Sequence, residues 1–84
     1  MPDKYIGNVS RFIDEINVAV VNLHETIHVG DKVRILGPSS DFQQEVPVMQ
    51  IRHKQVNEAG PGEQVGLLVK NRVDLQDRVY KILE

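Results

Sequence analysis

The sequence predicts an all-β protein: a small closed antiparallel β-barrel of about six or seven strands, in a single domain spanning residues 1–84. Short β-branched runs are separated by clusters of glycine, proline, serine and aspartate, a spacing typical of sandwiches and barrels. A chain of 84 residues has room for one hydrophobic core. Because the chain has no cysteine, burial of apolar side chains must supply its stability.

Two segments have the alternating pattern of half-buried strands. Residues 32–35 place Val33 and Ile35 on one face and two cations on the other. Residues 64–69 alternate in the same way, with Gly66 on the opposite face, where the backbone of a neighbour could approach closely. The expected core consists of the apolar positions that share this phase: Val9, Val20 or Val21, Val33, Ile35, Val65, Leu67, Val69 and Val79.

Residues 46–51 are expected to form a bent strand near an edge of the sheet. The apolar phase changes between Val48 and Met49, which indicates a bulge. Pro47 has no N–H and cannot donate to a ladder. Both features are tolerated best where one side of a strand has no partner.

The apolar residues of two segments also fit a helical stripe. These segments are residues 12–27 and 75–83. Residues 16–21 are dense in β-branched side chains, which pack better on a pleated sheet than in a helix. We therefore favour strands. Asp14 and Glu15 then form the tip of a hairpin between the first two strands, although neither is the usual turn glycine.

The basic residues are concentrated in the second half of a chain whose net charge is −2. Residues 51–83 hold six basic and four acidic groups, whereas residues 1–50 hold four basic and seven acidic ones. If the fold gathers them, four of these cations form a basic rim that could bind RNA or another partner; otherwise they are a solvated face. The four are Arg52, Lys54, Lys70 and Arg72.

The signatures of catalysis and of nucleotide binding are missing. Without a Gly-x-x-x-x-Gly-Lys-[Ser/Thr] loop, GTP binding is not expected. Without cysteine or a Gly-x-Ser-x-Gly elbow, nucleophilic catalysis has no specific basis, and Ser39-Ser40 fits a turn better. Asp74 and Asp77 could suggest acid–base work, as could Asp14-Glu15, but turns recruit acids routinely. We expect a protein that is not an enzyme and has no catalytic residue.

The histidines raise the alternative of a metal site. His24 and His28 stand four residues apart, a spacing that places both on one face of a helix, with His53 as a distant third ligand. On strands and turns they are better explained as surface polar groups, since zinc would still lack a fourth ligand. No metal and no other cofactor is expected.

Nothing in the sequence indicates a membrane. No stretch approaches the roughly 18 apolar residues of a membrane span, and the N-terminus lacks the apolar segment of a signal peptide. The expected location is cytoplasmic.

Two motifs dominate a wider resemblance. They are Ile-His-Val-Gly-Asp-Lys-Val-Arg-Ile at residues 27–35 and Ala-Gly-Pro-Gly-Glu-Gln-Val-Gly-Leu at residues 59–67. With them, the chain resembles domain 2 of elongation factor Tu and other translational GTPases, detached from its GTPase. The resemblance implies a binding module for RNA, a ribonucleoprotein or a translation-associated protein. It transfers no binding residue, and the first hairpin lacks the glycine common in that family.

A second resemblance has a different biological meaning. Tyr5-Ile6-Gly7, Val29-Gly30-Asp31 and the Val46-x-x-Met49 spacing are similar to the C-terminal domain of collagenase-like peptidases. This similarity implies a protein-interaction or substrate-positioning module for a peptidase-like partner encoded elsewhere.

Overall fold

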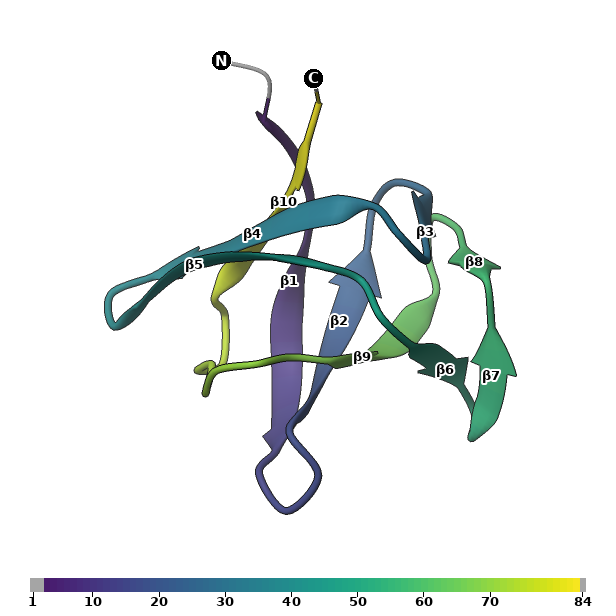
Figure 1. Ribbon diagram of the computed structural model, residues 1–84, viewed down its shortest axis with the longest axis horizontal. Helices are drawn as coiled ribbons and strands as arrows, with labels where there is room; N and C mark the ends of the chain where they lie inside the picture. Colours follow the sequence, from purple (N-terminus) through teal and green to yellow (C-terminus); the bar gives the residue numbers. More distant parts are fainter. Residues whose placement is uncertain (1–2, 84) are drawn as a thin grey trace.

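All regular structure in the computed structural model is β-strand, and the model describes residues 3–83 (Figure 1). The strands are β1 (Asp3–Ile13), β2 (Val18–Leu23), β3 (Ile27–His28), β4 (Lys32–Gly37), β5 (Ser40–Glu45), β6 (Met49–Ile51), β7 (Lys54–Val56), β8 (Glu58–Ala59), β9 (Gln64–Leu68) and β10 (Arg78–Ile82). The all-β prediction is confirmed, and neither ambiguous segment is helical. The predicted number of strands was too low, because several strands are only two or three residues long.

Eight strands form one antiparallel sheet in the order β5-β4-β10-β1-β2-β9-β6-β7, and β3 pairs with β8 in a separate ladder. An early strand pairs with a late one, since β1 pairs with β10 from Asp3–Ile82 to Asn8–Arg78. The prediction of a closed barrel is wrong for the described strands, because β5 and β7 are free ends of the order. The physical reason is that β6 occupies the edge of β9 that β5 would need for closure.

A side chain bridges the gap that the ladder leaves open. The Gln44 Nε2 donates to Leu68 O at 2.8 Å, and the Gln44 Oε1 accepts from Lys70 N at 2.8 Å. These two backbone groups lie on either side of Val69. The amide of Gln44 therefore provides the two hydrogen bonds that a neighbouring strand would otherwise provide. The sheet therefore curls until the end of β5 reaches the end of β9.

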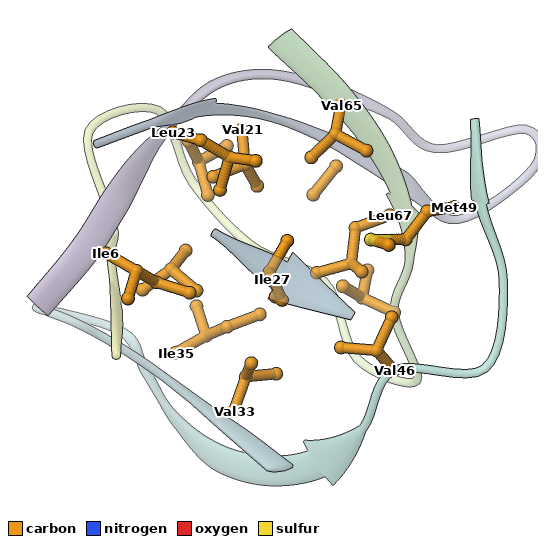
Figure 2. Close-up of a cluster of buried hydrophobic side chains, with 14 of the residues drawn as sticks. Ile6, Val21, Leu23, Ile27, Val33, Ile35, Val46, Met49, Val65 and Leu67 are labelled. Atoms are coloured by element: carbon orange, nitrogen blue, oxygen red, sulfur yellow. The ribbon is translucent and has the colours of Figure 1, made fainter. Parts of the chain in front are cut away.

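The core fills the inside of this curled sheet (Figure 2). Every predicted core position is buried, and Val21 rather than Val20 is the buried residue of that pair. The sequence pattern missed eight further buried positions: Ile6, Ala19, Leu23, Ile27, Val46, Met49, Ala59 and Val73. Most of these lie in short strands or loops, where no alternation is long enough to recognise.

The hairpin of the first two strands is present, with residues 14–17 as its turn. Asn17 has a φ of 55°. Asparagine tolerates this left-handed conformation better than most residues, so it takes the place of the missing glycine.

The two motifs of the wider resemblance meet in the structure. Residues 27–35 run from β3 into β4, and residues 59–67 run from β8 into β9. Ile27 lies opposite Ala59 in the β3–β8 ladder, and both side chains are buried. These motifs therefore specify the fold.

The strand predicted for residues 46–51 is shorter than expected. β6 begins only at Met49, beside the edge strand β7, and residues 46–48 lie outside it in place of a bulge. Val46 is the cause, because its N–H donates to Asp31 O and its carbonyl accepts from Gly30 N, both at 2.9 Å. Pro47 has no N–H to offer a ladder.

Replacing Leu67 by alanine is expected to lower the free energy of unfolding by about 2–5 kcal/mol, because the side chain is 1% exposed. Leu68→Ala is the matched control: the next side chain of β9 points outward, is 39% exposed and should cost about 0.5 kcal/mol or less. Urea denaturation measures both. Equal losses would mean that the register of β9 is wrong.

Gln44→Ala is expected to lower the free energy of unfolding by about 1–2 kcal/mol, because it removes two backbone hydrogen bonds, one to Leu68 at the end of β9 and one to Lys70 just after it. Hydrogen exchange at the Lys70 amide should accelerate, since its acceptor is lost. Gln43→Ala removes an equal side chain from the exposed face of β5 and should change neither measurement. If the two variants behave alike, Gln44 does not connect β5 to β9.

Candidate functional site

A groove of about 970 Å³ crosses the outer face of the sheet, between the β1–β2 hairpin and the β6–β7 hairpin. Both hairpins project from the curled body of the sheet in Figure 1. The groove is lined by Ile13, Ile16, Val18, Val20, Asn22, Gln50, Ile51, Arg52, His53, Gly62, Glu63, Gln64 and Gly66. Its lining combines apolar side chains with a few polar ones, as ligand sites in proteins usually do.

The floor of the groove depends on Gly66. Gly66 lies opposite Val20 on β2 and opposite Gln50 on β6. A Cβ atom at this position would lie 3.2 Å from a methyl group of Val18 and 3.6 Å from the Gln50 carbonyl oxygen. The close neighbour at Gly66 is thus the Val18 side chain, and the predicted neighbouring backbone lies at an ordinary contact distance. A larger residue would occupy part of the floor.

One wall of the groove is apolar. Ile16 lies in the β1–β2 turn and is 57% exposed, and Ile13 beside it is half-buried. Ile51, from β6 across the groove, adds a further apolar side chain and packs partly against the core. A solvent-exposed isoleucine next to further apolar side chains loses unfavourable contact with water when another molecule covers it.

The other wall contains a strained turn. Ile51 pairs with Lys54, so Arg52 and His53 form a two-residue hairpin connection with φ values of 52° and 67°. A turn with two positive φ values normally takes Asn-Gly, because other side chains are strained in this conformation. Backbone strain of this kind persists most often at functional sites.

The structure does not bring the four predicted cations together. Arg52 lines the groove, and Lys54 lies on the same hairpin outside the lining. Gln50 lies opposite Gly66, and β6 runs antiparallel to β9, so the continuation of this register places Arg52 beside the first residue of β9. Lys70 and Arg72 follow the last residue of β9. Six residues of extended chain separate the two levels, a distance of about 20 Å. A basic rim that joins all four cations, and RNA binding by them, stay predictions.

The carboxylate pair predicted to serve a turn does so. Asp77 is 1% exposed, and its Oδ2 accepts from Asp74 N at 2.9 Å. The same turn is joined to β1, where Val9 N donates to Asp77 O at 2.8 Å and Gln76 N donates to Val9 O at 2.7 Å. The backbone of Gln76 and Asp77 therefore connects the segment before β10 to the central strand.

The histidines lie apart from one another. His24 stacks on Tyr5 with ring centroids 5.6 Å apart. His28 lies between two carboxylates, with Nδ1 3.6 Å from Asp31 and Nε2 3.4 Å from Glu58. The third histidine is in the β6–β7 turn, and residues 3–83 contain no cluster of three side chains suited to a metal ion. Sequence reasoning considered His53 only as a metal ligand and missed its place in the groove. A two-residue turn without Asn-Gly was the available signal.

No helix within residues 3–83 is long and apolar enough to cross a membrane.

Comparison with known proteins relates the chain to proteases. It is 38% identical over 80 residues to an uncharacterized protease of Methanocaldococcus jannaschii, and 25% identical over 79 residues to a collagenase of Porphyromonas gingivalis. These matches cover 94% and 92% of this chain but only 20% and 22% of the relatives, so the chain spans about one fifth of their length. The chain is thus homologous to a domain-sized segment of these proteases. No family model matches it.

The fold leads to the same group of proteins. The crystal structure of the C-terminal domain of a Geobacillus thermoleovorans protein described as a U32 peptidase superposes with a TM-score of 0.86 and 22% identity, covering 93% of this chain and 91% of that one. The resemblance to the C-terminal domain of collagenase-like peptidases is confirmed. The resemblance to translation factor domain 2 stays a prediction.

The double variant Arg52→Asn with His53→Gly is expected to raise the free energy of unfolding by about 1 kcal/mol and the Tm by about 4–8 °C, because it relieves two left-handed residues. Thermal unfolding followed by circular dichroism measures this shift. Lys54→Gly is the control: its φ is not positive, so glycine there should lower the Tm. An unchanged or lower Tm in the double variant would show that the turn is not strained.

Proposed function

We propose that this chain is a non-catalytic domain that binds polypeptide and positions it for a peptidase. The observation that carries the proposal is the 38% identity over 94% of the chain to one fifth of a protease. A domain-sized segment of that length leaves most of the relative to carry the catalytic groups. A location in the cytoplasm, where the sequence predicts the chain, remains part of the proposal.

The serines support a role without catalysis. The Ser10 Oγ donates to Val20 O at 3.2 Å, which fixes the side chain between β1 and β2. Ser40 is 6% exposed and pairs with Gly37 in the β4–β5 hairpin. Both hydroxyls therefore lie within the sheet. The third serine, Ser39, is exposed in the β4–β5 turn and is not part of the groove lining.

The chemistry of the groove favours polypeptide over RNA. Its apolar wall suits side chains such as leucine, and its polar groups suit the peptide backbone. Binding an RNA backbone depends on several cations that neutralise neighbouring phosphates. Among residues 3–83, Arg52 is the one arginine or lysine in the groove lining.

The proposal is tested by measuring binding of casein, an unfolded polypeptide, to the immobilised chain. Saturable binding is expected, with casein recovered intact because the chain does not cleave it. A mixed-sequence RNA provides the second arm of the experiment. Cleavage of casein by the pure chain would make it an enzyme, binding of RNA without casein would favour the translation-factor resemblance, and binding of neither would overturn both.

A further inference from the structure

Within this proposed function, we infer that the groove recognises an extended polypeptide segment in which an apolar side chain is next to a carboxylate, and that Arg52 and His53 select the carboxylate. The apolar side chain lies against Ile16 and the floor at Gly66. The inference rests on the strain of the turn, on the unpaired charge of its arginine and on the shape of the floor.

The strain gives the first argument. An Asn-Gly turn would connect β6 to β7 at lower energy than Arg52 and His53 do. Both residues line the groove, whereas Lys54 does not, and a further left-handed residue, Gln76 with a φ of 71°, also lies outside it. The side chains at the strained positions are thus the ones that a molecule in the groove would touch.

The charges of the groove give the second argument. Its ionisable groups are Arg52, His53 and Glu63. The Glu63 carboxylate already accepts a hydrogen bond from Gly60 N, whereas Arg52 has no ion pair within 4.0 Å among the described residues. Arg34 is paired with Asp41 at 3.0 Å, whereas Lys54, Lys70 and Arg72 have no such pair either among the described residues, so what distinguishes Arg52 is its place in the groove lining. A free guanidinium fork at the rim matches a carboxylate in a bidentate arrangement.

The shape of the floor gives the third argument. Gly66 puts no side chain on the floor, where a methyl group of Val18 lies beside it, and Gln50 and Gln64 nearby are exposed amides. Amides both donate and accept, so they suit the N–H and C=O groups of an extended chain. Ile13, Ile16 and Ile51 flank this polar strip, within reach of an apolar side chain of the same segment.

Fluorescence polarisation with a labelled peptide of about eight residues tests the inference. The peptide contains Leu-Glu-Leu in a glycine–serine background, and a matched peptide contains Leu-Gln-Leu. Arg52→Gln should weaken binding of the glutamate peptide about tenfold, since a charged hydrogen bond contributes about that factor. Lys54→Gln removes the same charge from the same hairpin outside the groove and should change binding less than twofold. The glutamine peptide should bind the native chain about tenfold more weakly.

The variant Arg52→Asn with His53→Gly keeps the test independent of folding, because it is expected to be more stable than the native chain while binding the glutamate peptide at least tenfold more weakly. Equal effects of Arg52→Gln and Lys54→Gln, or equal binding of the two peptides, would overturn the inference. Casein binding that survives all these variants would leave the proposed function standing and place the polypeptide elsewhere. If oligouridylate binds more tightly than the peptide and displaces it, the groove is an RNA site and the inference is overturned.

Discussion

The fold depends on one strand, β1, which pairs with the last strand on one edge and with the second strand on the other. Its register shifts between Tyr5 and Gly7 against β10, and between Val9 and Arg11 against β2. Bulges bend a strand and increase its twist, so β1 can stay in both ladders while the sheet curls around the core. Gly7 is required here, because a side chain at this position would collide with the backbone of Asn22. Since β1 and β10 come from opposite ends of the sequence, the core is complete only after the last strand has joined, a topology that folds slowly.

The curled sheet also explains where the groove lies. Side chains alternate along β2, so Ala19, Val21 and Leu23 fill the core while Val18 and Val20 face outward. The outward valines are flanked by two hairpins, and neither hairpin is covered by another element among residues 3–83. Because β6 takes the free edge of β9, its hairpin stands beside the outer face of β2 and forms the second wall. The pairing of β6 with β9 therefore has two effects: it leaves the sheet open, and it forms one wall of the groove.

How far the sequence predicts this structure depends on the range of the interactions involved. Val33, Ile35, Val65 and Leu67 are predictable because alternation within one strand determines which side chains are buried. The open ladder is not, because it depends on Val46 bonding to the turn before β4 rather than continuing into β6, a contact that crosses the chain. Arg52 is recognisable as a cation, but its separation from Lys70 follows from the register of β6 on β9. No local pattern records that register.

The β6–β7 turn links stability to binding. Two left-handed residues without glycine or asparagine raise the energy of the folded state, and a domain of 84 residues has little stability to spare. A turn whose only task was to connect two short strands would gain from Asn-Gly and lose nothing. Asn17 shows that the chain uses asparagine where a left-handed residue is needed in the opposite hairpin. Gln76, with a φ of 71° outside the groove, shows that a left-handed residue alone does not mark a binding site. The proposal for Arg52 and His53 therefore rests on the strain of their turn together with their place in the groove lining.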